Sequence, residues 1–192
     1  MNVSYVFLAN GFEEIEALTV VDVLRRAGME VKTVSINDDC NVTGAHGIKV
    51  IADTALCKEK ITSAEWLIAP GGMPGSINLH NCEELGKLLK EQADKGGKVA
   101  AICAAPAFVL APLGILDGKE ATCYPGCESG FIDKVLRKDA PVVKDGNIIT
   151  ANGPASASLF ALAIVATSLG EGLAQEIGAA MLHYHQPINI YL

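Results

Sequence analysis

The sequence lacks a basic segment and a long apolar run. Its 15 Lys and Arg residues are outnumbered by 22 Asp and Glu residues, which gives a formal net charge of -7, and no cationic cluster could neutralise a phosphate backbone. No apolar stretch approaches the roughly 20 residues of a membrane-spanning helix, and residues 1–11 lack the basic start and cleavage site of a secretion signal. We therefore expect a cytoplasmic protein that binds neither nucleic acid nor membranes.

Paired cysteine motifs are also missing. No C-x-x-C occurs, and no histidine stands at zinc-finger spacing from a cysteine, which argues against a metal site. Without a secretory context, the cysteines are expected to be free thiols. Two of them flank Pro125-Gly126 and could meet across a turn, although unpaired thiols are the simpler interpretation. The six are Cys40, Cys57, Cys82, Cys103, Cys123 and Cys127.

The glycine motifs that hold nucleotide phosphates, G-x-x-x-x-G-K-[ST] and G-x-G-x-x-G, are absent, and we expect no cofactor. No histidine adjoins Cys103, so a Cys-His-carboxylate triad cannot be assigned from the sequence. This tells against a peptidase and against a glutamine amidotransferase. Each of the four histidines could be an ordinary surface or core residue: His46, His80, His183 and His185.

Short apolar runs alternate with segments of helical period. The runs at 3–9, 30–36, 65–69, 98–102 and 147–151 read as strands, and 47–53 as a further candidate. The segments 14–27, 84–94 and 155–170 read as helices, with Asn81 as the expected cap of the second, whereas 118–139 is irregular. Near-continuous apolar strands between helices predict a doubly wound, parallel α/β sheet covered on both faces, in one domain spanning 1–192.

Ligands bind beyond the carboxyl ends of the strands in such sheets. Cys103 follows the strand at 98–102, and Pro106 suits the first turn of a helix. A thiolate at a helix start meets free N–H groups, a setting in which cysteine pKa values fall from about 8.5 to between roughly 3.5 and 7.5. We therefore predict a lowered pKa for Cys103, at a tight elbow that exposes a nucleophile. A buried structural thiol is the alternative.

Glu16 points into the apolar arc of the helix at 14–27. A carboxyl group there is either paired or desolvated enough to keep its proton, which would let it hydrogen-bond a neighbouring thiolate. An ordinary first-turn glutamate is the alternative. The Pro70-Gly71-Gly72 loop could supply N–H groups to an oxyanion hole together with the N–H of Ala104, or could be a plain turn.

Four motifs in this order resemble the ThiJ/PfpI superfamily, in particular its DJ-one branch. They are G-F-E-E-I-E (11–16), P-G-G (70–72), A-A-I-C-A-A-P (100–106) and N-G-P-A-S (152–156). The resemblance covers essentially the whole chain. It implies a flavodoxin-like sheet of the kind found in class I glutamine amidotransferases, and a homodimer.

The resemblance also implies roles for individual residues. Cys103 matches the family's oxidisable nucleophile and Glu16 its protonated glutamate, while Gly72 and Ala104 match the backbone donors. The G-P loop of the pocket corresponds to Asn152, Gly153 and Pro154. Two positions depart from the pattern: Tyr124 replaces a pocket histidine, and His46 aligns with an arginine. Ala104 replaces the histidine of the PfpI peptidase branch, which speaks against protease activity.

Two functions stay open. The first is a cofactor-free cysteine enzyme for small 2-oxoaldehydes such as methylglyoxal, or for their glycated adducts, of the glyoxalase III or deglycase type. The second is a redox sensor or oxidative-stress chaperone whose Cys103 is oxidised to a sulfinate. Both need an activated, accessible thiol, so the sequence does not separate them.

Overall fold

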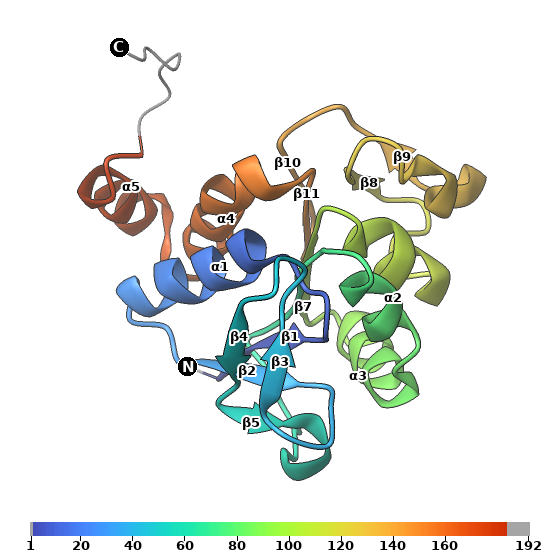
Figure 1. The fold of residues 1–192 in the computed structure, drawn as a ribbon. Helices are drawn as coiled ribbons and strands as arrows, with labels where there is room; N and C mark the ends of the chain where they lie inside the picture. The colour runs from blue at the N-terminus through green and yellow to red at the C-terminus, as the bar shows by residue number, and fades with distance from the viewer. Residues whose placement is uncertain (1, 184–192) are drawn as a thin grey trace, which may run out of the picture.

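Seven strands build one central sheet in the order β10-β11-β7-β6-β1-β2-β5 (Figure 1). The computed structural model describes residues 2–183, so His185 lies outside the described residues. Every neighbouring pair in the sheet is parallel except the edge pair of β10 and β11, which confirms the α/β class. The strands are β1 (Ser4–Leu8), β2 (Val31–Ser35), β5 (Thr54–Ala55), β6 (Trp66–Ala69), β7 (Lys98–Ile102), β10 (Val142–Asp145) and β11 (Ile148–Ala151).

Helices cover both faces of the sheet. Figure 1 shows α1, α4 and α5 on one face and α2 and α3 on the other. Side chains along each strand alternate between the two layers: in β1, Val6 and Leu8 join the core under α1 and α4, while Tyr5 and Phe7 join the core on the opposite face. The helices are α1 (Glu14–Arg26), α2 (Gly75–His80), α3 (Glu83–Asp94), α4 (Ala157–Leu169) and α5 (Glu171–Ala180).

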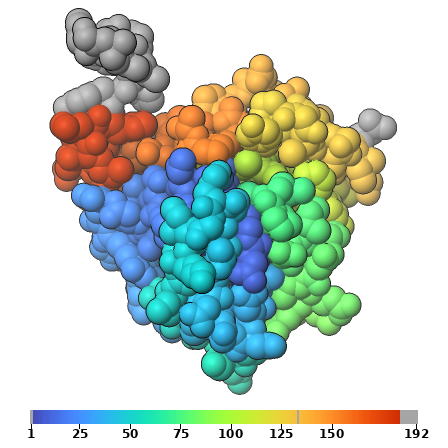
Figure 2. All heavy atoms as spheres, in the orientation of Figure 1, coloured from blue at the N-terminus to red at the C-terminus, as the bar shows by residue number. Residues whose placement is uncertain are grey.

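Smaller elements decorate this frame. The strand predicted at 47–53 is β4 (Lys49–Ile51), which pairs with β3 (Asn41–Thr43) in a separate antiparallel hairpin and does not join the central sheet. In Figure 2 this hairpin (teal) lies on the same face as the start of α1 (blue). The irregular region contains the parallel pair β8 (Glu120–Ala121) and β9 (Leu136–Arg137), and a 3-10 helix at Glu128–Lys134 lies between them.

The expected cap of α3 is wrong. Asn81 ends the short helix α2, and Cys82 stands at the start of α3 without a side-chain capping bond. The sequence pattern concealed α2 because its six residues are too few for a helical period to be visible. Likewise, the segment after Cys103 is a π-helical turn at Pro106–Leu110 followed by a 3-10 turn at Ala111–Leu113, where a regular short helix was expected.

Four neighbouring strands bring together the loops that carry the four motifs. β11, β7, β6 and β1 are adjacent and mutually parallel, so the loops after them open at one edge of the sheet. The chain runs from β1 outward to β2 and β5 and then returns to β6 on the other side. The boundary between β1 and β6 is therefore the topological switch point, where α/β sheets bind ligands.

Candidate active site

Cys103 occupies a strained turn directly after β7. Its φ of 66° is left-handed, a conformation that non-glycine residues adopt uncommonly and that concentrates at functional sites. The turn is held by the Cys103 N–H, which donates to the Ala151 carbonyl at 2.8 Å, and Pro106 opens the following π turn. The side chain is buried, with 9% of its surface exposed. The backbone thus forms the predicted tight elbow.

Glu16 lies wholly inside the protein on the apolar side of α1, with no exposed surface. Its Oε2 accepts the Gly71 N–H at 2.8 Å. Oε1 is buried and lacks a hydrogen bond of ordinary geometry among the described residues. A Cβ atom built on Gly71 would lie 2.5 Å from Glu16 Oε2 and 2.6 Å from Cys103 Cβ. Glu16 and Cys103 therefore flank the same glycine and adjoin each other.

Two positions in the loop after β6, residues 71 and 72, must be glycine. Gly71 has no room for a side chain between Glu16 and Cys103, and Gly72 has a φ of 94° with Glu13 N only 2.4 Å from where a Cβ would stand. The Glu13 N–H donates to the Gly71 carbonyl at 3.0 Å, and this bond ties the loop to the start of α1. The same strained loop presents the Gly72 N–H to the Cys103 sulfur.

The two acids control each other's protonation. Burial raises the pKa of Glu16 to about 7, while the Cys103 thiol and the Gly71 N–H act in the opposite direction. Burial, followed by the charge of Glu16, raises the pKa of the Cys103 thiol. The N–H groups of Gly72 and Ala104 lower this pKa but do not outweigh burial. The predicted lowering of the thiol pKa is therefore wrong, because it counted the N–H groups and omitted desolvation. The pair therefore gains its first negative charge as the pH rises through about 7, and the two groups titrate as a unit.

A pocket of about 410 Å³ opens over the thiol. Tyr124 forms part of its wall, is 46% exposed, and donates its N–H to the Cys103 carbonyl at 2.8 Å. Burial, followed by the charge of Glu128, raises the pKa of the Cys127 thiol on the same wall. The lining residues are Glu13, Gly72, Met73, Cys103, Ala104, Tyr124, Pro125, Gly126, Cys127 and Pro154.

Three residues expected in the pocket lie beside it. Asn152 accepts a hydrogen bond from the Ser156 hydroxyl at 2.6 Å, and Gly153 packs behind the Tyr124 ring. His46 stands on the β3–β4 hairpin, largely exposed, with Nδ1 2.8 Å from Glu14 Oε2. Only Pro154 of the predicted G-P loop reaches the lining. The prediction placed His46, Asn152 and Gly153 too close to the pocket, because motif order does not determine which residues of a loop reach the lining.

The profile of the DJ-1/PfpI family matches residues 3–167. The chain belongs to the DJ-1/PfpI family. Drosophila melanogaster dj-1beta is 38% identical over 178 residues, which cover 92% of this chain and 95% of the relative. Arabidopsis thaliana DJ-1 homolog B is 36% identical over 184 residues, 96% of this chain but 42% of that relative. The chain spans less than half the length of the two Arabidopsis relatives that it matches.

Solved structures of DJ-1 proteins share the fold. Oxidized Toxoplasma gondii DJ-1 superposes with a TM-score of 0.91 at 35% identity, covering 95% of this chain and 98% of that one. Drosophila melanogaster DJ-1beta gives a TM-score of 0.90 at 37% identity, covering 94% and 97%. These matches confirm both the family expected from the motifs and its flavodoxin-like sheet.

The DJ-1/PfpI motifs do not reveal every residue at the site. The Gly71 N–H holds Glu16 in place, whereas the sequence interpretation gave the Pro70-Gly71-Gly72 loop only the role of an oxyanion hole, together with Ala104. Glu13 and Cys127 line the pocket, and neither was singled out for it. Glu13 belongs to the G-F-E-E-I-E motif that also contains Glu16, so its position was a usable signal. Cys127 follows Tyr124, which the resemblance had placed in the pocket, by three residues, so its position was a signal as well.

Within residues 2–183, one group of side chains has metal-ligand geometry at the rim of this DJ-1/PfpI site. Glu13, Glu14 and His46 each offer an atom within 4.8 Å of the others. Glu14 already accepts the His46 N–H at 2.8 Å and faces the imidazole, and this contact raises the pKa of His46. The cluster thus has internal partners and fastens the β3–β4 hairpin to α1.

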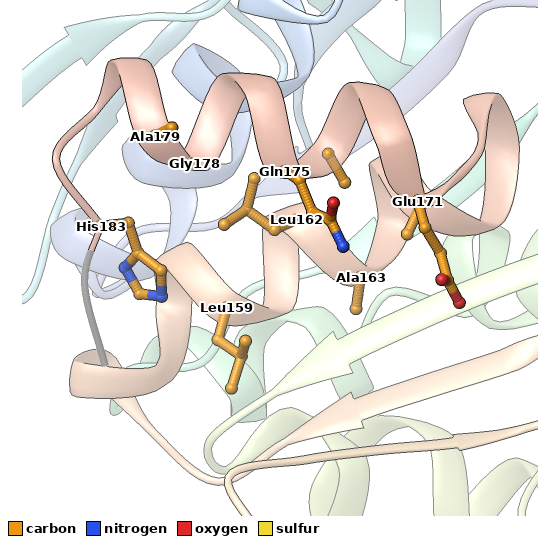
Figure 3. Close-up of a pocket in the computed structure, with 10 residues that line it drawn as sticks. Leu159, Leu162, Ala163, Glu171, Gln175, Gly178, Ala179 and His183 are labelled. Atoms are coloured by element: carbon orange, nitrogen blue, oxygen red, sulfur yellow. The ribbon is translucent and has the colours of Figure 1, made fainter. Parts of the chain in front are cut away.

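A second hollow lies between α4 and α5, and it shares no lining residue with the pocket over Cys103. It also measures about 410 Å³ and is mostly apolar. Figure 3 shows Leu162 and Gln175 facing the space between the two helices, with Leu159 and His183 at one end and Glu171 at the other.

Among the described residues, no helix is long and apolar enough to cross a membrane.

Proposed function

We propose that this protein is a cofactor-free cysteine enzyme that converts small 2-oxoaldehydes, such as methylglyoxal, or hydrolyses their glycated adducts. The observation that carries the proposal is the buried Glu16–Cys103 pair beneath a pocket of about 410 Å³. A relative supports the substrate class: Caenorhabditis elegans glutathione-independent glyoxalase DJR-1.2 is 36% identical over 159 residues, 82% of this chain and 83% of that protein.

Proton transfer by Glu16 suits this chemistry. A general acid–base group works best when its pKa lies near the working pH, and burial brings the pKa of Glu16 to about 7. No histidine lines the pocket among the described residues, so Glu16 is the proton carrier next to the sulfur. The form that reacts has the proton on Glu16 and the negative charge on Cys103.

The first step forms a hemithioacetal. The Cys103 sulfur attacks the aldehyde carbon, a C–S bond forms, and the carbonyl π electrons move to the oxygen. The N–H groups of Gly72 and Ala104, which face the sulfur, stabilise this developing oxyanion. Glu16 then delivers its proton to the oxygen and becomes a carboxylate.

The remaining steps return the enzyme to its starting state. The Glu16 carboxylate removes the proton on the former aldehyde carbon, which gives an enediolate. That proton returns at the neighbouring carbon, and the hydroxyl proton moves to the neighbouring oxygen, which gives a hydroxyacyl thioester. Water then cleaves the C–S bond and releases the 2-hydroxy acid and the Cys103 thiol. For methylglyoxal the sum is one water added to give lactate, with no net redox change and no external cofactor.

The test is lactate formation from methylglyoxal in the absence of glutathione. Cys103→Ala is expected to abolish turnover, and Glu16→Gln to lower kcat by about 10²–10⁴-fold, the usual contribution of general acid–base catalysis. Cys57→Ser is the matched control, because Cys57 is exposed and lies outside the pocket. Turnover that survives both site substitutions would refute the proposal.

A redox role for the same thiol is the second candidate. The T. gondii relative was solved in an oxidized state, and the N–H groups that face Cys103 could equally hold the oxygens of a sulfinate. Mass spectrometry after mild peroxide treatment separates the two functions. A selective gain of two oxygens on Cys103 beside negligible aldehyde turnover favours the sensor.

We also propose a cytoplasmic homodimer. Four exposed apolar side chains, which we call the hairpin patch, lie on α1 and the adjacent β3–β4 hairpin region: Ile15, Leu18, Ile48 and Ile51. Glu14 joins the two elements through His46 and Ile48, and exposed apolar residues on joined elements are a candidate protein interface. The six unpaired cysteines fit a reducing compartment.

A further inference from the structure

A second cysteine lines the pocket that opens over Cys103. Cys127 lines the same pocket of about 410 Å³ as Cys103 and is half-buried, and it packs against the core cluster to which Cys103 belongs. Cys123 is closer to Cys103 in sequence than Cys127 is, but it is fully buried and does not line the pocket. Of the six cysteines, Cys127 alone shares the pocket with Cys103.

A tight turn presents Cys127 at this point. The Cys127 N–H donates to the Tyr124 carbonyl at 2.9 Å, Pro125 follows Tyr124, and Gly126 has a φ of 95°. Proline at the second position and a left-handed glycine at the third are typical of a type II turn. The Tyr124 N–H donates to the Cys103 carbonyl at 2.8 Å. Two successive backbone hydrogen bonds therefore connect the two cysteines.

We propose that Cys127 is the resolving thiol for oxidised Cys103. A hydroperoxide transfers one oxygen to the Cys103 sulfur, which gives a sulfenic acid and releases water or an alcohol. The Cys127 sulfur then displaces the hydroxyl, so that an S–S bond forms, the Cys127 proton joins the leaving hydroxide and a second water departs. An external dithiol reduces the disulfide and restores both thiols.

The shared pocket favours this step over further oxidation. Conversion of the sulfenic acid to a sulfinate needs a second peroxide molecule from solution, whereas Cys127 is already on the pocket wall. A disulfide requires Cα atoms within about 7 Å, and Gly126 gives the turn the backbone freedom to adjust. The inference concerns the redox chemistry of Cys103 and does not depend on aldehyde turnover.

Peroxide titration of the reduced full-length protein tests the proposal. Trypsin separates Cys103, in the peptide 99–119, from Cys127, in the peptide 120–134. Wild type is expected to lose two hydrogens and to yield these two peptides linked, and dithiothreitol should release them. In Cys127→Ser the hydrogen peroxide dose that converts half of Cys103 to the sulfinate should fall by about tenfold, because the sulfenic acid persists.

Cys123→Ser is the matched control, since its peptide also holds Cys127 and the variant should still form the link. Equal sulfinate dose curves for wild type and Cys127→Ser, with no linked peptides, would overturn the inference. A link that vanishes in Cys123→Ser but persists in Cys127→Ser would overturn it as well, because it would make Cys123 the partner. Loss of aldehyde turnover in any variant leaves this readout unaffected.

Discussion

At the scale of single residues, the site depends on one carboxyl group in an apolar position. Glu16 occupies a place on α1 where a hydrophobic side chain would pack, and its Oε2 takes the Gly71 N–H at 2.8 Å. Burial raises its pKa to about 7, so it can hold or release a proton under neutral conditions. The same burial keeps the Cys103 pKa high. In the proposed mechanism the nucleophile therefore forms by proton sharing between the two groups.

The raised pKa of Glu16 predicts how stability depends on pH. The folded protein keeps this proton up to pH about 7, and the unfolded chain releases it near the ordinary glutamate pKa of 4.5. The folded state thus binds more protons between these values, and stability falls as the pH rises through them. Relative to Glu16→Gln, wild type should lose on the order of 3 kcal/mol between pH 4.5 and 7.

Urea unfolding at pH 5, 6, 7 and 8, followed by the fluorescence of the single tryptophan, measures this difference. Contributions from titrating groups that do not interact with Glu16, His46 among them, are common to both proteins and cancel. A stability difference that stays constant over this range would contradict a buried, proton-holding Glu16.

Gly71 provides a second test at this scale. Alanine there would place a Cβ 2.5 Å from Glu16 Oε2 and 2.6 Å from Cys103 Cβ, so the two side chains must separate. We expect Gly71→Ala to destabilise the protein by about 1–3 kcal/mol through overpacking and to lower the reactivity of Cys103 toward iodoacetamide. Chemical denaturation and alkylation rates measure the two effects.

Gly172→Ala is the control for this substitution. Gly172 lies in α5 with open space where a Cβ would stand, so alanine should be neutral or stabilise by about 0.4–1 kcal/mol. If both variants behaved alike, the loop after β6 would not be packed as described.

At the scale of elements, the sheet and the helix layer are joined by a specific polar contact. The indole N–H of Trp66, on the fully buried face of β6, donates to the Ser168 hydroxyl on α4 at 2.7 Å. The rest of α4 packs through apolar side chains such as Phe160 and Val165. This contact fixes the position of α4 along the sheet, because a buried N–H has no water to bind instead.

Ser168→Ala should therefore leave the Trp66 N–H without its partner and cost about 1–3 kcal/mol of unfolding free energy. The tryptophan is its own reporter, so fluorescence-detected unfolding records both stability and a changed indole environment. Thr167→Ala is the neighbouring control: its hydroxyl donates to Ala163 O within α4, at 2.8 Å, and the change should stay within about 0.5 kcal/mol. Equal losses of unfolding free energy in the two variants would contradict the proposal that Ser168 joins α4 to the sheet.

At the scale of the whole molecule, the active edge and the hairpin patch are neighbours. Glu14, the first residue of α1, holds the β3–β4 hairpin through its contact with His46. The next residue on the helix, Ile15, is 56% exposed. The elements that carry the patch therefore also support Glu13 and Glu16. A dimer formed through this patch would therefore contact the elements that position Glu16.

Ile51→Asp should dissociate the proposed homodimer. Ile51 is the most exposed side chain of the patch, at 81%, and a charge there would have to be desolvated in the interface. Light scattering coupled to size exclusion measures the mass, with Leu136→Asp on β9 as a control on an exposed apolar residue outside the patch. A monomeric wild type, or a dimer that survives Ile51→Asp, would contradict the proposed interface.

The alternating elements, the parallel sheet, the family and the loops that meet at the sheet edge all followed from the sequence alone. The elements follow from local features, because hydrophobic period and turn glycines act within about 15 residues. The family followed from the order of four motifs along the chain. The helical period also indicated that Glu16 points inward. It could not reveal α2, whose six residues are too short to display a period.

The surroundings of each side chain, by contrast, were settled by the tertiary structure. Desolvation depends on atoms from every packed element, so the pKa of Cys103 is raised where N–H groups alone predicted a fall. The β3–β4 hairpin buries Glu14 although its helix position reads as polar. The turn at residues 124–127 brings Cys127 to the pocket from beyond β8. Burial and proximity are sums over the whole fold, and no local pattern encodes them.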